Sequence, residues 1–228
     1  EVVLPAGEEN KTVGSVERIW DAALDAGLDR DGLVVGVGGG VVGDLAGFAA
    51  STLLRGIALA QVPTSLLAMV DSSVGGKTGF NRPQGKNLVG TFHQPRFVAC
   101  DVETLSSLPD VERRAGFAEV VKSAWLDGEA AVASLERDAE RLAAGDPAAT
   151  VRAIRMAVGL KARIVTEDER EAGTRMLLNL GHTVAHALEA ARGYRALRHG
   201  EAVSLGMVAA FRVARALEQC GDSEPERM

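Results

Sequence analysis

The stretch LVVGVGGGVVGD, residues 33–44, determines the fold expected for the first half of this 228-residue chain. Its first five residues form a compact apolar run, which is typical of a buried parallel strand. The glycines that follow can make a tight turn, and the mostly apolar segment 41–54 after them predicts a helix. A buried strand, a glycine turn and a helix in this order indicate the start of a parallel α/β domain.

Further strands and helices are expected on both sides of this unit. Apolar runs predict strands at 2–4, 57–62 and 97–100, and helical spacing of apolar residues predicts a helix at 13–26. Beyond residue 109 the strand pattern ends, and segments rich in Ala, Leu, Glu and Arg predict helices at 109–127, 129–144, 148–170, 176–192 and 201–219. We therefore expect an α/β domain with a parallel sheet over 1–107 and an all-α domain over 108–228.

The composition narrows the class of protein. The chain has 46% hydrophobic and 25% charged residues, a balance typical of a globular protein with a sizeable core. Its 25 basic and 31 acidic residues give a net charge of −6, which argues against a nucleic-acid or anionic-membrane binder. Cys100 and Cys220 are too few for a disulfide framework, and no run approaches the roughly 18 apolar residues of a membrane span. A cytoplasmic protein is expected.

The glycine turn has features of a phosphate-binding site. Gly38, Gly40 and Gly43 match G-x-G-x-x-G, a pattern that lets backbone N–H groups and a helix N-terminus approach a diphosphate. The acidic residue that usually follows about 20 positions later is absent, because that region reads QVPT at 61–64. The pattern therefore predicts a non-standard dinucleotide site, and the alternative is a tight turn that only packs helix on strand.

The segment 72–99 has neither Asp nor Glu, although the whole chain has an acidic surplus. It carries Lys77, Arg82, Lys86 and Arg96 among five glycines. Glycines permit backbone anion nests, and lysines supply charge for phosphate. We expect a long functional loop that binds the phosphate of a substrate or cofactor. A solvated loop without a ligand is the alternative.

Three of the four histidines predict a metal site. His182 and His186 are four residues apart and share one face of the expected helix, which Glu189 continues, and His199 follows. Two histidines and one carboxylate with an open position are typical of catalytic zinc. The carboxylate could come from Glu189, Glu201 or Glu119, and the residues alone leave this choice open. Glu119 has a second interpretation, since it could simply pair with Lys122 at i,i+3.

An ordered set of strings resembles one family. These strings are GGGVVGDLAGF at 38–48, PTSLLAMVDSSVGGKTGFN at 63–81, GKNLVGTFHQP at 85–95, DEREAGTRMLLNLGHTVAHALE at 168–189 and HGE at 199–201. Together they resemble the 3-dehydroquinate synthases, a branch of the sugar phosphate cyclases. Since members of that family are longer at both ends, we expect this chain to be a fragment.

The resemblance implies the site residues. It assigns NAD to Glu8, Lys11, Gly40, Val41, Val42, Gly43, Asp44, Thr64, Ser65, Lys77, Lys86, Thr104, Leu105, Ser106 and Ser107. It assigns the metal, zinc or cobalt, to Glu119, His182 and His199. It assigns substrate contacts to Arg55, Asp71, Asn87, Lys122, Lys161, Arg175, Asn179 and His186, with Asp71, Lys77, Lys122 and His186 taking part in the chemistry. Arg55 would reach a neighbouring subunit's site, which implies a homodimer.

The implied reaction makes 3-dehydroquinate and phosphate from 3-deoxy-arabino-heptulosonate 7-phosphate, a step in the biosynthesis of aromatic amino acids. In the family, a hydroxyl is oxidised, phosphate leaves, the hydride returns, and ring opening precedes an aldol closure. Three alternatives are another sugar phosphate cyclase, a metal-dependent polyol dehydrogenase and an inactive truncated remnant. The string DSSVGGKTG at 71–79 resembles the dehydroquinate form more than the other cyclases.

Overall fold

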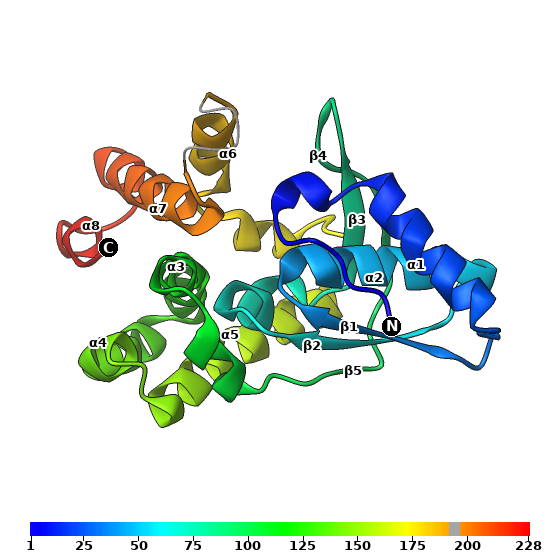
Figure 1. The fold of residues 1–228 in the computed structure, drawn as a ribbon. Helices are drawn as coiled ribbons and strands as arrows, with labels where there is room; N and C mark the ends of the chain where they lie inside the picture. The colour runs from blue at the N-terminus through cyan, green and yellow to red at the C-terminus, as the bar shows by residue number, and fades with distance from the viewer. Residues whose placement is uncertain (192–196) are drawn as a thin grey trace. The chain divides into compact units, whose positions relative to one another are not determined.

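The structure is a computed structural model that describes residues 1–191 and 197–228. The chain divides into two compact units, Glu1–Leu108 and Pro109–Met228, and each is described by itself. Figure 1 shows strands and helices in the first unit and helices alone in the second. The expected combination of a parallel sheet and a mostly helical second part is confirmed.

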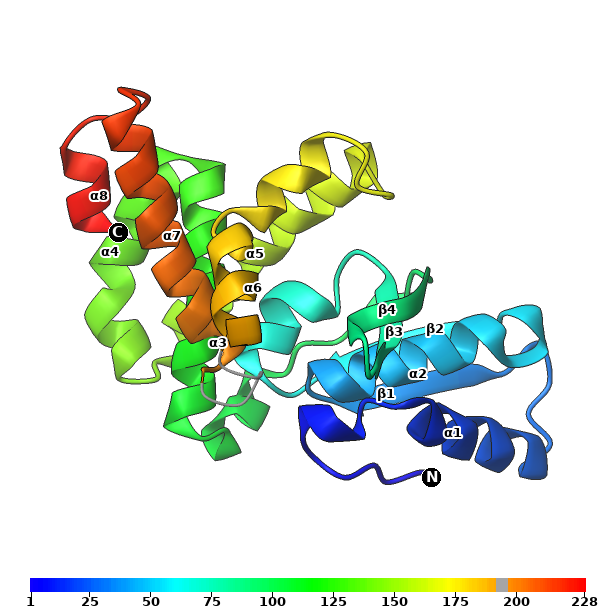
Figure 2. The same ribbon diagram turned by 90° about the horizontal axis from the view of Figure 1, so that it is seen from above.

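A three-stranded parallel sheet forms the centre of the first unit. Its strands are β1 (Leu33–Gly38), β2 (Ala58–Pro63) and β5 (Phe97–Val98), in the order β1-β2-β5. Helix α2 (Gly40–Thr52) lies against the sheet, and α1 (Val13–Asp25) lies beside α2 (Figure 2). Between these helices, the core cluster holds Val16, Leu45, Phe48 and Ala49.

The sequence explains the close contact of α2 with the sheet. A Cβ atom on Gly43 would lie 2.9 Å from Oε1 of the buried Gln61 on β2. Gln61 also donates from Nε2 to the Gly43 carbonyl oxygen at 3.0 Å, so strand and helix are joined by a side chain. The third glycine of the motif is therefore needed for helix–strand packing, whatever the turn binds.

Two expectations for the first unit are wrong. The segment 72–99 is not one long loop, because it contains an antiparallel hairpin of β3 (Lys77–Arg82) and β4 (Gly85–Phe92). The hairpin packs on α2 through Phe80, whose ring centroid lies 5.2 Å from that of Phe48. The segment 2–4 is not a strand, because none of the strands in residues 1–191 and 197–228 pairs with it.

Short helical turns join the larger elements of the first unit. They are η1 (Glu8–Asn10), η2 (Leu53–Arg55), the π-helical turn η3 (Ala68–Ser72) and η4 (Val102–Ser107). Turn η3 follows β2, and η4 follows β5. π-Helical turns are rare and often occur at functional sites.

The second unit is built from helices. They are α3 (Asp110–Asp127), α4 (Glu129–Ala143), α5 (Pro147–Glu167), the 3₁₀ turn η5 (Thr174–Asn179), α6 (His182–Ala191), α7 (His199–Ala216) and α8 (Ser223–Arg227). The helix expected at 176–192 begins only at His182, because Gly181 has φ +82° and separates η5 from α6. Arg192, its expected last residue, lies outside the described residues. Helix α8 was not expected.

Helices α6 and α7 pack through small and apolar side chains. Ala185 of α6 is fully buried with Ala202, Val203 and Met207 of α7. Helix α5 begins where Asp146 accepts a hydrogen bond from the Ala149 N–H at 2.7 Å, directly before Pro147. An Asp at the N-cap followed by Pro at the first helical position is a favoured way to begin a helix.

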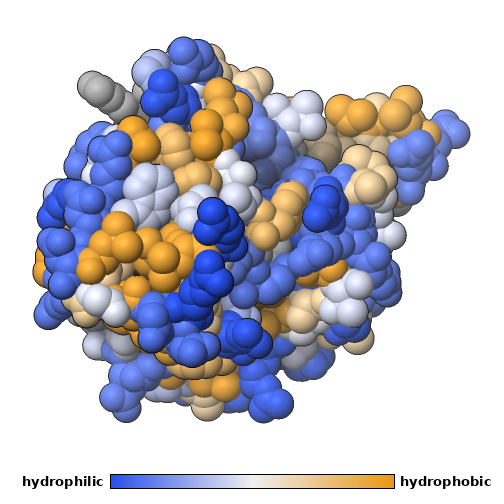
Figure 3. Space-filling view, turned by 90° about the vertical axis from the view of Figure 1, so that its right-hand side faces the viewer, coloured by the Kyte–Doolittle hydropathy of each residue, from blue (hydrophilic) through white to orange (hydrophobic). Residues whose placement is uncertain are grey.

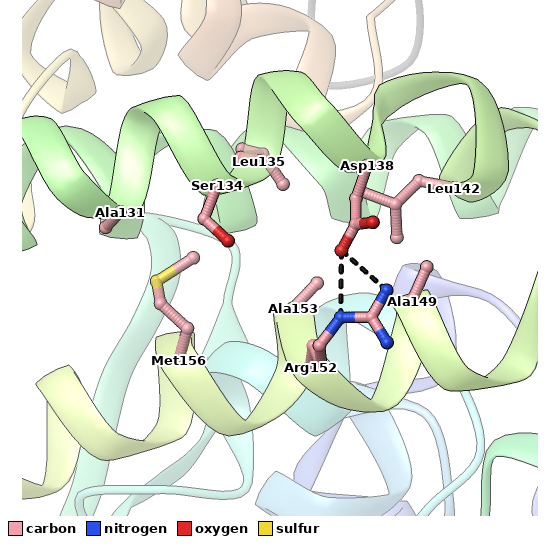
Figure 4. A pocket seen from close by; sticks show the side chains of 9 residues that line it. All are labelled: Ala131, Ser134, Leu135, Asp138, Leu142, Ala149, Arg152, Ala153 and Met156. Carbon is pink, nitrogen blue, oxygen red and sulfur yellow. Dashed lines mark hydrogen bonds and ion pairs between the residues drawn. The ribbon is translucent and has the colours of Figure 1, made fainter.

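The surface carries apolar side chains among polar ones, and Figure 3 shows them as orange patches between blue residues. No helix in the described ranges is both long and apolar enough to span a bilayer. A small hollow lies between α4 and α5, lined by residues that include Leu135 and Met156 (Figure 4). Arg152 bridges it by donating to Asp138 at 2.7 and 2.9 Å. It contains none of the residues expected to act in a site.

Candidate functional site

One carboxylate and two imidazoles converge in the helical unit. Glu119 comes from the middle of α3, His182 from the first residue of α6 and His199 from the first residue of α7. Glu119 Oε1 lies 3.9 Å from His182 Nε2 and 3.6 Å from His199 Nε2. Each residue offers one donor atom within 4.8 Å of the other two. The three sequence-predicted metal ligands are therefore brought together.

Close contact between α3 and α7 brings His199 toward Glu119. A Cβ atom on Gly200 would lie only 1.9 Å from the carbonyl oxygen of Ala115. Ala115 lies four residues before Glu119, one turn earlier on α3. Gly200 therefore lets the first turn of α7 touch α3 near the carboxylate.

The second oxygen of Glu119 has a different partner. Lys122 Nζ forms an ion pair with Glu119 Oε2, and both side chains are at most 3% exposed. The simpler interpretation of Glu119, a pair at i,i+3, is therefore present together with the metal-type grouping. A buried charge needs such a partner, because burial removes its hydration.

The other candidate ligands have different contacts. Glu189 Oε1 lies 3.5 Å from Nδ1 of His199, on the ring edge away from Glu119. Glu201 accepts a hydrogen bond at 2.8 Å from the backbone N–H of Arg198 and so caps α7. His186 is exposed, and its ring centroid lies 5.5 Å from that of His182 in an edge-on arrangement.

The charges of the two imidazoles differ. Burial lowers the pKa of His182, and the charge of Lys122 lowers it further. Burial also lowers the pKa of His199, but hydrogen bonds to Glu119 and Glu189 outweigh this effect and raise it to about 9. The metal-free site thus holds a positive charge between two carboxylates, which is the electrostatic setting that a cation requires.

The donor set fits a divalent metal. Zinc bonds of about 2.0–2.1 Å in a tetrahedral arrangement put neighbouring donor atoms about 3.3–3.5 Å apart. The separations of 3.6 and 3.9 Å between Glu119 Oε1 and the two imidazole nitrogens are slightly longer than this, and all three donor atoms lie within 4.8 Å of one another. Two histidines and one carboxylate leave one position for a bound oxygen, as in catalytic zinc sites.

Most of the expected NAD residues of the first unit lie after the ends of parallel strands. Gly40–Asp44 follows β1, Thr64 and Ser65 follow β2, and Thr104–Ser107 follows β5. The Thr64 N–H donates to the Gly38 carbonyl oxygen at 2.9 Å, which joins two of these segments. The carboxyl ends of parallel strands form one edge, where open α/β sheets bind ligands.

A buried lysine connects three segments at this edge. Lys11 is 4% exposed, forms an ion pair with Asp44 and donates to Asn87 Oδ1 at 2.6 Å. Asn81 Nδ2 donates to Glu8 Oε1 at 2.7 Å, so the hairpin is also tied to η1. Burial raises the pKa of Asp44, and the nearby Lys11 opposes this shift. Glu8, Lys11, Asp44 and Asn87 thus form one polar network.

Both halves of the chain match one protein family. Residues 1–115 match the family described as 3-dehydroquinate synthase N-terminal, and residues 116–228 match its C-terminal counterpart. The chain belongs to the 3-dehydroquinate synthase family. A 3-dehydroquinate synthase of Pelobacter propionicus is 50% identical over all of this chain, and one of Symbiobacterium thermophilum is 55% identical over 94% of it.

The chain is shorter than these relatives. It spans 63% of the Pelobacter synthase and 60% of the Symbiobacterium synthase. The expectation that the sequence is a fragment of a family member agrees with this coverage.

Solved structures show the same fold. A Streptomyces 2-epi-5-epi-valiolone synthase with NAD⁺ and Zn²⁺ bound is 31% identical, with a TM-score of 0.91 over 99% of this chain and 63% of its own. A 2-deoxy-scyllo-inosose synthase, complexed with carbaglucose-6-phosphate, NAD⁺ and Co²⁺, is 32% identical, with a TM-score of 0.83 over 97% of this chain and 60% of its own. A probable glycerol dehydrogenase of Sinorhizobium meliloti is 19% identical with a TM-score of 0.67, which shows the fold alone.

The substrate residues that the synthase family implies in the helical unit are largely buried. Lys161 is 8% exposed and Arg175 is 2% exposed. Arg175 donates from Nη1 to the Glu169 carbonyl oxygen, while its backbone N–H donates to Asp168 at 3.0 Å. Asn179 is exposed and donates to Glu171 at 2.9 Å. All three lie on α5 or η5.

The remaining synthase residues of the first unit are spread more widely. Asp71 lies in the π-helical turn, and Lys77 and Lys86 lie on the two strands of the hairpin. Arg55 lies beyond the C-terminal end of α2, about 20 Å along a 13-residue helix from the glycine turn. Within the first unit, Arg55 is therefore not brought to the NAD segments.

Two contacts at the candidate site do not follow from the sequence pattern. The pairing of Lys11 with Asp44 joins residues 33 positions apart, and no local pattern predicts it. The residue pattern presents Glu189 only as a candidate ligand and does not indicate its contact with Nδ1 of His199. Its position seven residues after His182, on the same helix face, was the available signal.

Proposed function

We propose that this chain carries the NAD- and metal-dependent active site of a 3-dehydroquinate synthase. The reaction is the conversion of 3-deoxy-arabino-heptulosonate 7-phosphate to 3-dehydroquinate and phosphate. The observation that carries the proposal is the grouping of Glu119, His182 and His199 in a chain whose two halves both match the family.

The degree of similarity favours this cyclase over its relatives. The chain is 50 and 55% identical to the two synthases described above, and 31 and 32% identical to the valiolone and inosose synthases. A polyol dehydrogenase is disfavoured, because the likeness to that group extends to the fold alone.

The cofactors supply the redox and Lewis-acid chemistry. When bound, NAD would accept and return a hydride, and a divalent metal held by Glu119, His182 and His199 would acidify a substrate hydroxyl. The glycine turn and the N-terminus of α2 would hold the diphosphate of NAD. Ser65 and the network around Lys11 and Asp44 would complete that site.

The chain's own residues bind the substrate and move protons. Lys161 and Arg175 carry positive charges that suit the negative groups of a carboxylated sugar phosphate. His186 is exposed beside His182, so it can exchange a proton near the leaving phosphate without binding the metal. Lys122 would contact the substrate from its position beside Glu119.

The same proposal includes the cellular context. A homodimer in which Arg55 reaches the partner's site is supported by its distance from the NAD segments of its own unit. A cytoplasmic location is supported by the two free cysteines, Cys100 and Cys220, since a reducing compartment preserves thiols.

The test incubates the purified chain with the heptulosonate phosphate, NAD and zinc, and measures inorganic phosphate. We expect phosphate release that requires both cofactors, without net accumulation of NADH, because the hydride returns to the substrate. Net NADH accumulation would support a dehydrogenase instead. If the chain binds both cofactors but releases no phosphate, the proposal is wrong for this chain.

A further inference from the structure

Glu189 lies behind one of the proposed metal ligands. Its side chain is 4% exposed, and its Oε1 lies 3.5 Å from Nδ1 of His199. On the opposite edge of the same ring, Nε2 lies 3.6 Å from Glu119 Oε1. The His199 imidazole is therefore held between two buried carboxylates, one on each nitrogen.

The other imidazole has the same arrangement. His182 Nδ1 lies 3.3 Å from the Leu180 carbonyl oxygen, and its Nε2 faces Glu119 Oε1. Each ring thus has an oxygen acceptor at Nδ1 and turns Nε2 toward the same carboxylate. An acceptor at Nδ1 keeps the proton there and leaves the Nε2 lone pair available for a metal.

Helix α6 supplies both parts of this arrangement. His182 and Glu189 are seven residues apart, about two helical turns, so they point to the same side of α6. Helix α7 packs against α6 through Ala185 and Val203, which fixes His199 relative to that side. One rigid helix therefore presents a ligand and the carboxylate that orients the second ligand.

We propose that Glu189 is a positioning residue for the metal: its carboxylate accepts a hydrogen bond from Nδ1–H of His199, which keeps the proton on Nδ1 and presents Nε2 to the ion. This inference rests on the metal site of the proposed function. Glu189 is not itself a ligand in this arrangement, because it lies at the nitrogen that faces away from Glu119. The carboxylate also balances part of the charge that a divalent ion brings into the buried site.

The test compares Glu189→Ala and Glu189→Gln with the unchanged chain. Zinc affinity is measured by competition with a chromogenic chelator, and the protonated nitrogen of His199 is identified by ¹⁵N NMR of the zinc-bound protein. We expect Glu189→Ala to weaken zinc binding about 10–100-fold, the usual cost of losing an outer partner of a metal-bound histidine. Glu189→Gln keeps an oxygen acceptor and should lose less.

A matched control separates this role from simple packing. Glu140→Ala makes the same change on the exposed face of α4 and should leave zinc affinity unchanged. Metal-free stability is recorded by thermal unfolding for every variant. The inference would be overturned if both Glu189 variants bound zinc as tightly as the unchanged chain and differed from it only in metal-free stability.

The same measurements distinguish the inference from the function on which it rests. If the unchanged chain fails to bind zinc, the proposed metal site is wrong. If the unchanged chain binds zinc and the Glu189 variants bind it equally well, only the role of Glu189 is wrong. Glu189→Gln is close in shape to the original side chain, so it provides the affinity comparison if Glu189→Ala does not fold.

Discussion

Glu119 shows how much a single side chain contributes at this site. One oxygen pairs with Lys122 on the next turn of α3, and the other faces two imidazoles from other helices. Removing the carboxylate would leave Lys122 buried without its counter-ion, which typically costs about 3–5 kcal/mol. The side chain is therefore needed for the fold and for the proposed ligand set, and a metal test is clearer at the histidines.

The two histidines of α6 should separate metal binding from proton transfer. We expect His182→Ala to weaken zinc binding by more than about 100-fold, because one of three ligands is lost. His186→Ala should leave zinc affinity within about twofold of the unchanged chain, since the ring lies outside the ligand group. The chelator competition assay measures both. Turnover should be lost in either variant, and a fall in zinc content of His186→Ala would show that its assigned role is wrong.

Asp168 gives the chain a pH-dependent contribution to stability. Backbone N–H groups of Ala172, Arg175 and Gly173 donate to its carboxylate and lower its pKa. Because the folded pKa is lower than the unfolded one, this stabilisation is present at neutral pH and is lost as pH falls through the folded pKa. Asp168→Asn should therefore lower the stability at pH 7, and the difference should shrink below about pH 4.

Urea unfolding of the two proteins at pH 7 and in acid checks this prediction. Glu140→Gln removes one charge from an exposed helix face and should change stability at pH 7 by less than about 0.5 kcal/mol. An equal difference between Asp168→Asn and the unchanged chain at both pH values would contradict the assigned cause.

At the scale of elements, close contacts at glycines position the ligands. Gly200 lets α7 approach the backbone of α3 at Ala115, and His199 is the residue before it. The element boundaries are set by similar local features, such as Gly181 between η5 and α6. The positions of the three proposed ligands therefore depend on close backbone contacts as well as on the ligand side chains themselves.

Gly200→Ala tests this dependence. The added methyl group meets the Ala115 carbonyl oxygen at 1.9 Å, so α7 must move. We expect a loss of about 1–3 kcal/mol in unfolding free energy together with weaker zinc binding. Gly159→Ala on α5 is the matched control, because its Cβ has only an arginine side-chain tip 3.8 Å away. It should raise stability by up to about 1 kcal/mol and leave zinc affinity unchanged. Unchanged zinc binding in Gly200→Ala would contradict the argument.

The sequence predicts helices better than it predicts pairing. Helix α4 has strong local signals, and its expected range of 129–144 differs from the structure by one residue. The hairpin was missed because Gly79, Gly85 and Gly90 interrupt the alternation of apolar residues, and its strands are identified only by their pairing. The expected strand at 2–4 is wrong for a related reason, since no strand in the described part of the chain pairs with it.

For the candidate site, the spacing of the residues narrows the choice of the carboxylate ligand to three residues. Glu189 and His182 share a helix, so their relation could be seen in the sequence. The contact of Glu119 with His199 joins helices 80 residues apart and depends on how α3 and α7 pack, which no local pattern encodes. The network of Lys11, Asp44 and Asn87 is non-local in the same way.

At the scale of the whole chain, one face of the sheet exposes apolar side chains on its two outer strands, β1 and β5. Alternate apolar side chains along β1 are 42–59% exposed, namely Leu33, Val35 and Val37. Phe97 on β5 is 53% exposed and is paired with Ala60 of β2, which is paired in turn with Val35. Val34 packs with the core on the other face, toward α2. Parallel sheets are usually covered on both faces. The relatives contain further sequence with no counterpart here, since the chain spans about 60% of their length.

The division into two units predicts where each ligand stabilises the chain. The proposed metal ligands all lie within Pro109–Met228, and the segments proposed for the NAD diphosphate lie within Glu1–Leu108. At about 100 times its dissociation constant, a ligand stabilises the state that binds it by about 2.7 kcal/mol. In amide hydrogen exchange, zinc alone should therefore give its largest protection in α3, α6 and α7, and NAD alone in α2 and the segment after β2. If zinc mainly slowed exchange in α2, or NAD mainly in α6, the assignment of the ligands to the units would be wrong.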